Sequence, residues 1–231
     1  MCMNLNIFEA CRAFGVRKLL CCLSTCIFPD ATPYPLTEGM LHAGPPHPSN
    51  ASYAHAKRMV DVLARAYATQ YGLQCACLVP TNVFGPHDNF SLEDGHVLPA
   101  LIHRCHAAQA SGGDFVVWGS GTPVRQFILS ADLAALTLWA LRSYHSSEPL
   151  ILSPGPEAEV SIAQAAAMVA AGLGFTGRLL FDASKADGQQ RKTASNSRLL
   201  ALHPGAAFTP MQQGVAETCQ WFKEHHATAR K

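Results

Sequence analysis

The sequence has little charge and no long run of apolar residues. Asp, Glu, Lys and Arg make up 14% of the 231 residues, the formal net charge is +1, and Lys and Arg form no cluster. Proteins that bind nucleic acid through charge need clustered basic residues, so we expect no nucleic-acid partner. No stretch reaches the roughly 18 apolar residues that span a membrane, so we expect no membrane partner either.

The sequence also lacks a disulfide pattern and an export signal. Its nine cysteines are an odd number without regular spacing, which is typical of free thiols in a reducing compartment. The start, Met1-Cys2-Met3-Asn4, has no basic segment ahead of an apolar one, as a signal peptide would have. We therefore expect a cytoplasmic protein.

Cysteine and histidine do not occur at the spacing of a metal site. Cys75-Ala76-Cys77 would place two thiols on one face of a strand, but no second pair of ligands follows at zinc-type spacing. We expect Cys75 and Cys77 to lie in the core, and we predict no metal site.

What the sequence does contain is an alternation of helices and strands. A helical pattern over 5–14 precedes a short apolar run over 18–23, which is typical of a strand buried on both faces. A proline-rich loop over 28–48 leads to a helix over about 50–72 and a second apolar strand over 73–79. This order predicts a parallel α/β sheet, in which ligands bind beyond the carboxyl ends of the strands. Further along, the patterns predict helices over 97–110, 133–141 (opened by Asp132), 161–171 and from an N-cap at Thr209, and strands over 115–118, 126–129, 150–152 and 179–181.

One glycine pattern is a decoy. Gly172-Leu173-Gly174-Phe175-Thr176-Gly177 matches the G-x-G-x-x-G of dinucleotide-binding loops. That motif needs a strand before it and a helix after it, so that the amino terminus of the helix receives the pyrophosphate. Here a predicted helix precedes the glycines and a strand follows them, so we interpret them as a helix stop and a turn.

The helix over about 50–72 carries Tyr53 and Lys57, which the i, i+4 spacing places one turn apart on one face. Tyrosine is a poor acid-base catalyst at neutral pH, and a neighbouring ammonium group favours its phenolate form. The two residues are therefore a candidate acid-base couple. Taken alone, a Tyr-x-x-x-Lys is more often an exposed aromatic residue and a solvated charge.

Several segments, taken in chain order, carry a resemblance to a known family. They are Ser24-Thr25-Cys26, Tyr53-Ala54-His55-Ala56-Lys57, the string from Pro80 to Phe90, Gly95-His96-Val97-Leu98-Pro99, Val117 to Pro123 with Arg125, and Asp187-Gly188 ahead of Arg191-Lys192. Over essentially the whole chain they resemble the extended short-chain dehydrogenase/reductase family. More narrowly, the chain is similar to the members that turn GDP-4-keto-6-deoxymannose into GDP-L-fucose by 3,5-epimerisation and NADPH-dependent 4-reduction.

The resemblance implies roles for five chemically active residues. Ser24, Tyr53 and Lys57 would form the reductase triad, in which Tyr53 gives a proton to the 4-keto oxygen that Ser24 hydrogen-bonds. Cys26 and His96 would be the epimerisation pair, because the keto group acidifies the protons at C3 and C5 and a thiol and an imidazole can exchange them. Cys26 could instead be one more core thiol, and His96 a loop histidine.

The resemblance also implies the binding residues. NADPH would be lined by Lys57, His96 and the segment Pro80, Thr81, Asn82 and Val83. The GDP-sugar would be held by Arg104, Trp118, Arg125, Asp187 and Lys192, since arginines suit diphosphate groups. Each has an ordinary alternative: Trp118 could simply pack, Arg104 could be solvated, and Arg125 could form a surface ion pair.

The fold that the resemblance implies is α/β. We expect an incomplete Rossmann-like parallel sheet over 1–153, with 97–122 contributing to the substrate side, and a smaller C-terminal α/β substrate-binding domain over 154–231. Family members begin with a strand, a glycine-rich phosphate loop and further strand-helix units, on the order of 80 to 90 residues that this sequence does not contain. We therefore expect weak NADPH binding and doubtful reductase activity from these residues alone, and poor solubility caused by an exposed strand edge at 18–23.

In this family, subunits usually pair through two helices that are both present here. We expect a homodimer through the Tyr53/Lys57 helix and the N-terminal helix. Two alternatives stay open: a non-catalytic shortened chain that dimerises with full-length subunits, and another nucleotide-sugar epimerase or dehydratase. Cys26 together with His96 argues against the second.

Overall fold

The computed structural model describes residues 1–231, and the chain divides into two compact units. The first unit contains residues 1–81, 133–156 and 192–207, and the second contains 82–132, 157–191 and 208–231. Each has its own cluster of buried hydrophobic side chains. Because the chain passes between the units several times, they do not follow sequence order; the domain boundary after residue 153 stays a prediction.

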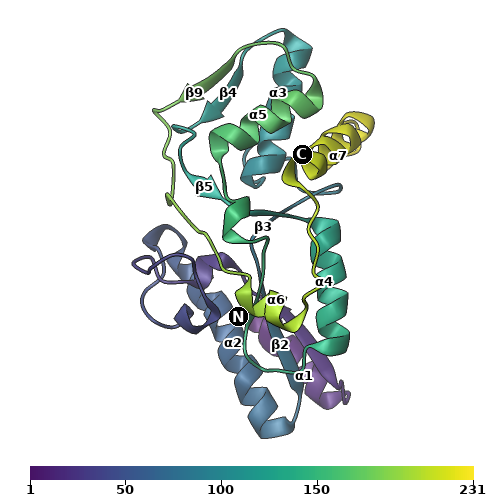
Figure 1. Ribbon diagram of the computed structural model, residues 1–231. Coiled ribbons are helices and arrows are strands. Elements are labelled where there is room, and N and C mark those ends of the chain that lie inside the picture. The colour runs from purple at the N-terminus through teal and green to yellow at the C-terminus, as the bar shows by residue number, and fades with distance from the viewer. The chain divides into compact units, whose positions relative to one another are not determined.

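The first unit is built on a parallel sheet of three strands in the order β1-β2-β7, with α2 packed against β2 (Figure 1). The predicted parallel α/β architecture is therefore confirmed. Its elements are α1 (Cys2–Ala13), β1 (Lys18–Cys22), α2 (Ala51–Tyr71), β2 (Gln74–Pro80), most of α4 (Ser130–Ser143), β7 (Leu150–Leu152) and α6 (Ser197–Leu202). Short 3₁₀ turns cover Thr25–Ile27, Glu38–Met40 and Pro48–Asn50.

Strand β1 lies at one edge of this sheet. It pairs with β2 alone, in a register that places Cys21 opposite Cys77. Leu19 and Leu20 are half-buried, and a cavity of about 250 Å³ beside them is lined by residues of α1, β1 and α2. The apolar run predicted to be buried on both faces is therefore partly exposed, because only one of its edges is paired.

The second unit consists of helices with three pairs of short strands. The pairs β3-β6 and β4-β9 are parallel, and β5-β8 is antiparallel. Its elements are β3 (Asn82–Phe84), α3 (Val97–Ser111), β4 (Phe115–Trp118), β5 (Val124–Arg125), β6 (Phe127–Leu129), β8 (Val160–Ser161), α5 (Ile162–Leu173), β9 (Leu179–Asp182) and α7 (Met211–His225).

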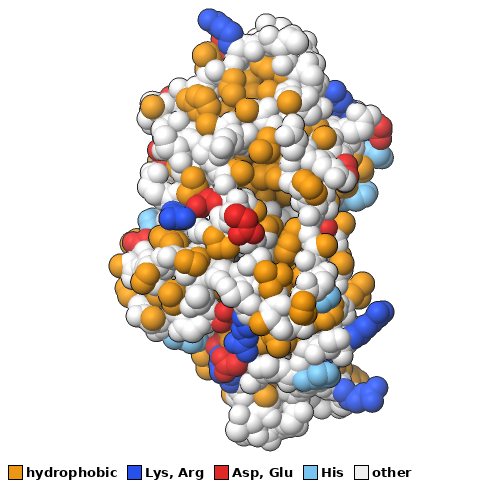
Figure 2. Space-filling model, viewed as in Figure 1, with side chains coloured by type: hydrophobic (Ala, Val, Ile, Leu, Met, Phe, Trp, Pro, Cys, Tyr) orange, Lys and Arg blue, Asp and Glu red, His pale blue; other side chains and the backbone are white.

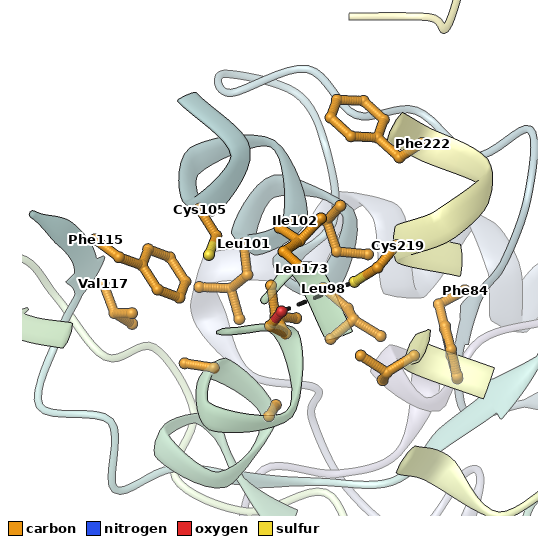
Figure 3. Packing of buried hydrophobic residues seen from close by; sticks show 14 of the residues in the cluster. Phe84, Leu98, Leu101, Ile102, Cys105, Phe115, Val117, Leu173, Cys219 and Phe222 are labelled. Atoms are coloured by element: carbon orange, nitrogen blue, oxygen red, sulfur yellow. Dashed lines mark hydrogen bonds between the residues drawn. The ribbon is translucent and has the colours of Figure 1, made fainter. Parts of the chain in front are cut away.

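Helices α3, α5 and α7 pack against one another to form the core of the second unit. Figure 3 shows this core, with Phe115 of β4 on one side and Phe222 of α7 on the other. Both phenyl rings are fully buried, as is the side chain of Cys105 of α3. Charged side chains are sparse on the face drawn in Figure 2, and no helix is both long and apolar enough to cross a membrane.

Helix α5 begins and ends as its sequence predicts. Ser161 caps it, accepting a hydrogen bond from the Gln164 N–H while the Gln164 side chain accepts one from the Ser161 N–H. Gly174 ends it in a left-handed conformation with φ of 68°. Gly172 thus lies in the last turn of α5, and Gly174 and Gly177 lie between α5 and β9. The order is helix and then strand, which confirms that these glycines are not a phosphate-binding loop.

The predicted cap of the last helix is wrong by one residue. The N-cap of α7 is Pro210, and the side chain of Thr209 is used elsewhere. The Thr209 N–H and hydroxyl donate to the two carboxylate oxygens of Asp132, at 2.7 and 2.9 Å. Because Asp132 binds this segment, the hydroxyl is not free to cap, and α4 begins two residues before Asp132, at Ser130.

Candidate active site

The predicted site residues are divided between the two units. The first unit holds Ser24, Cys26, Tyr53, Lys57, Pro80, Thr81 and Lys192. The second holds Asn82, Val83, His96, Arg104, Trp118, Arg125 and Asp187.

Ser24 and Cys26 lie just beyond the carboxyl end of β1. Ser24 has an extended backbone, and its Oγ accepts a hydrogen bond from the Cys26 N–H at 3.3 Å, which starts the 3₁₀ turn Thr25–Ile27. Cys26 is half-buried, so its thiol is not part of the core. The turn therefore presents a hydroxyl and a thiol two residues apart at the strand end.

Helix α2 places Tyr53 and Lys57 on one face, one turn apart. The Lys57 ammonium lies 5.9 Å from the centre of the Tyr53 ring, and half of the Tyr53 surface is exposed. Lys57 Nζ also donates to the backbone carbonyl of Cys22, the last residue of β1, at 2.8 Å. This bond ties the Tyr53 face of α2 to the strand end that leads into Ser24.

Lys192 lies against Cys26. Its Nζ donates to Cys26 Sγ at 3.4 Å, although the two residues are 166 positions apart in the sequence. The residues that follow Lys192 are fixed to Leu36: the Leu36 N–H donates to the Thr193 carbonyl at 2.7 Å, and the Ser195 N–H donates to the Leu36 carbonyl at 2.8 Å. The structure thus brings a predicted substrate-binding lysine to the predicted epimerase thiol.

Thr81 follows the carboxyl end of β2, beside the end of β7. Its N–H donates to the Leu152 carbonyl at 3.3 Å, and Pro80 is the register partner of Leu152. The Thr81 hydroxyl is buried and has no hydrogen-bond partner. A buried polar atom without a protein partner needs an explanation, such as a catalytic role or a bound water or ion. Of the next two residues, Asn82 binds the Gln126 carbonyl through its side chain at 2.7 Å, and Val83 is half-buried in β3.

In the second unit, Arg104 and Trp118 form a stacked pair. The guanidinium carbon lies 3.6 Å from the centre of the indole ring, and burial lowers the pKa of Arg104 below its usual value. Trp118 is 54% exposed, so its ring is not a packing residue of the core. Two cavities, of about 280 and 190 Å³, share Trp118, Val97 and Ile162 in their walls.

Arg125 and Asp187 line the smaller of these cavities, and both are held by polar contacts. Arg125 donates through Nη1 to the Val124 carbonyl at 2.7 Å and through Nη2 to the Gln189 carbonyl at 2.5 Å. The Asp187 carboxylate accepts from the N–H and the hydroxyl of Ser120, at 2.7 and 2.8 Å. These contacts fix the turn after β4 against the segment that carries Asp187.

His96 is the N-cap residue of α3, and an acidic residue that sequence reasoning missed lies near it. Burial raises the pKa of Asp88, an effect that the Asn89 N–H and the charges of His96 and Arg230 oppose. Asp88 belongs to the string from Pro80 to Phe90 that carries the resemblance, and this string was the signal that could have found it.

Arg58 is the second residue that sequence reasoning missed. It is 8% exposed, and it donates to the Ile27 carbonyl at 2.6 Å and to the Gly44 carbonyl at 2.7 Å. It therefore anchors α2 to the turn that contains Cys26. An arginine next to a lysine in a helix looks like a surface residue, and no local signal distinguishes it.

Comparison with known proteins gives a consistent result. The profile of the NAD dependent epimerase/dehydratase family matches residues 1–152. The chain is 52% identical to a GDP-L-fucose synthase of Dictyostelium discoideum over 229 residues, which are 99% of this chain and 72% of that protein. It is 45% identical over 236 residues to a probable GDP-L-fucose synthase of Drosophila melanogaster, covering 99% of this chain and 74% of that one. A crystal structure of a GDP-L-fucose synthetase from Naegleria fowleri bound to NADP matches with a TM-score of 0.95 and 52% identity, over 99% of this chain and 73% of the other.

Proposed function

The chain belongs to the NAD dependent epimerase/dehydratase family and, within it, to the GDP-L-fucose synthases, and we propose that its own residues carry out that chemistry as set out below. The reaction is 3,5-epimerisation of GDP-4-keto-6-deoxymannose followed by NADPH-dependent reduction of the 4-keto group. The observation that carries the assignment of residues is the meeting of the Ser24–Cys26 turn and Lys57 at the carboxyl end of β1.

The residues at the strand ends fit the nicotinamide part of NADPH. The buried Thr81 hydroxyl lacks a partner that a ligand can supply. Lys57 uses one N–H on the Cys22 carbonyl, and an ammonium group has two more to give. Lys57, His96 and the segment Pro80, Thr81, Asn82 and Val83 would hold the cofactor. When bound, NADPH supplies the hydride for the reduction.

Tyr53, Ser24 and Lys57 serve the reduction. Tyr53 gives a proton to the 4-keto oxygen, where the charge of the alkoxide would otherwise develop. Ser24 donates a hydrogen bond to the same oxygen, since its hydroxyl oxygen already accepts from Cys26 and its proton is free. Lys57 keeps a positive charge beside the Tyr53 ring.

Cys26 and His96 serve the epimerisation. The 4-keto group acidifies the protons at C3 and C5, so one side chain removes a proton from a ring carbon and the other returns one to the opposite face. Epimerisation must precede reduction, because the acidity of these protons is lost with the keto group.

The GDP-sugar is held by cationic side chains together with one aromatic ring and one carboxylate. Arg104 with Trp118, and Arg125 with Asp187, bound the two cavities of the second unit. Guanidinium groups bind diphosphates through paired, charge-assisted hydrogen bonds, and an exposed indole ring offers a flat apolar surface. Lys192 contributes a further positive charge.

The assembly that we propose is a homodimer through α1 and α2. Both helices expose large apolar side chains, among them Met3 and Ile7 of α1 and Met59 and Val62 of α2. Apolar side chains gathered on neighbouring helices favour a subunit interface. Nine free cysteines suit a reducing compartment, which supports a cytoplasmic location.

The decisive experiment follows proton exchange and reduction separately. GDP-4-keto-6-deoxymannose is incubated with the protein in deuterated water, and deuterium at C3 and C5 is measured by NMR; NADPH oxidation is measured in parallel. Exchange needs no hydride, so we expect it without NADPH. A folded protein that catalyses neither exchange nor NADPH oxidation would contradict the proposal.

A further inference from the structure

We propose that Lys192 is a positioning residue for Cys26, an inference that rests on the proposed epimerisation. Its ammonium group would hold Cys26 Sγ toward the sugar ring and face the negative charge on that sulfur whenever Cys26 has given up its proton.

The contact itself is specific to these two side chains. Lys192 Nζ donates to Cys26 Sγ at 3.4 Å. Both residues are half-buried, and Lys192 forms no ion pair with a carboxylate. A lysine that only needed to be solvated would gain nothing from lying on a thiol, since sulfur is a weak acceptor.

The backbone on both sides of the contact is fixed independently. On the side of Lys192, the two hydrogen bonds with Leu36 hold residues 193–195 as a short bridge. On the side of Cys26, Ser24 Oγ binds the Cys26 N–H, and Arg58 binds the Ile27 carbonyl. The fold therefore sets the positions of the two backbone segments between which ammonium and sulfur meet.

The chemistry of proton exchange explains the use of such a contact. One proton moves between a ring carbon and Cys26 Sγ, with no net change in bonds or electrons over the full cycle. In one of its two forms Cys26 is a thiolate, and the thiolate is the reactive species of cysteine. A positive charge within hydrogen-bonding distance stabilises that form relative to an uncharged neighbour.

This role differs from the binding role that the resemblance implies for Lys192. A residue that only binds the GDP-sugar does not affect Cys26 when substrate is absent. A residue that faces the sulfur does, and the two roles are compatible because only one of the three N–H groups is used on Cys26.

The test is the rate at which iodoacetamide alkylates Cys26 without substrate, resolved by peptide mass spectrometry. We expect Lys192→Met to slow alkylation of Cys26 roughly tenfold near pH 7, and Lys192→Arg to restore it. Near pH 9.5, where free thiols are mostly ionised, the difference should largely disappear. Exposed Cys2 is the internal reference, and Lys231→Met is the matched control; neither should change.

Three results would overturn the proposal: unchanged alkylation of Cys26 in Lys192→Met, no recovery in Lys192→Arg, or an equal loss at both pH values. If Lys192→Met does not give the circular dichroism of the parent protein, Lys192→Gln carries the same comparison. Deuterium exchange at C3 and C5 is then measured for each variant. Absence of both exchange and NADPH oxidation in the folded parent protein would refute the proposed function, whereas the alkylation rates would still decide the role of Lys192.

Discussion

Replacing Phe222 by Ala should lower the free energy of unfolding of the second unit by about 3 to 5 kcal/mol. The ring of Phe222 is fully buried. Its centre lies 4.5 Å from that of Phe90, 5.5 Å from those of His103 and His106, and 5.3 Å from that of His226. Figure 3 shows the ring on α7, at the border of the cluster with α3. Groups from α3, α7 and the loop before α3 meet at this ring. Because they cannot all move to fill the cavity that Ala would leave, we expect a loss of free energy in the upper part of this range.

The assay is urea unfolding followed by tryptophan fluorescence in a Trp139→Phe background. The remaining tryptophans, Trp118 and Trp221, both belong to the second unit. Phe14→Ala is the matched control, because the same side chain is removed from a position that is 86% exposed; it should change the free energy by less than about 0.5 kcal/mol. A loss below about 1 kcal/mol for Phe222→Ala, or equal losses for the two variants, would refute the reasoning.

Three further predictions concern pH, catalysis and solubility. Burial first, and then nearby positive groups, lower the pKa values of His106 and His226 in the fold. The fold therefore favours the neutral imidazoles: their contribution to the free energy of unfolding is present above about pH 6.5 and is lost as the pH falls through the lowered pKa values. Thermal unfolding of the parent and of His106→Gln checks this, and equal pH dependence in both would contradict it. Tyr53→Phe should slow 4-keto reduction by about 10² to 10⁴ and leave deuterium exchange at C3 and C5 intact; parallel losses would speak against separate roles. Leu20→Lys, on the unpaired edge of β1, should reduce aggregation measured by light scattering, and an unchanged rate would show that another surface is responsible.

The regular elements were predictable because their signals are local. The apolar run at β1, the Tyr53 helix ending at Gly72 and the Ser161 cap of α5 each depend on neighbours a few residues away, and all three are confirmed. The sequence patterns do not predict the short strands β3 and β8 or the helix α6, and they do not separate β5 from β6. Unlike the apolar runs at β6 and β7, these short strands carry no apolar run of their own, and their pairing depends on a distant partner strand.

The division of the chain into units could not be predicted for the same reason. The domain boundary after residue 153 stays a prediction. The division into compact units places residues 133–156 and 192–207 with the first unit, because the chain returns to it twice. The bond between Lys192 and Cys26 spans 166 positions, and Arg58 is buried through carbonyl groups at Ile27 and Gly44. Both contacts depend on where the chain returns, which local patterns do not encode.

Two kinds of signal predict the residues of the candidate site, and the roles of these residues stay predictions. Ser24 and Thr81 each follow a parallel strand, and β1 and β2 are adjacent, so the rule that ligands bind at strand ends already places them together without any family. Trp118 and Arg104 came from resemblance alone, with core packing and a solvated charge as the alternatives. The indole ring is 54% exposed, so it is not core packing, and the guanidinium 3.6 Å from its centre forms a cation–π pair with it. A flat ring stacked on a cation at the wall of two cavities suits an aromatic, phosphorylated ligand, and the binding role of both residues stays a prediction.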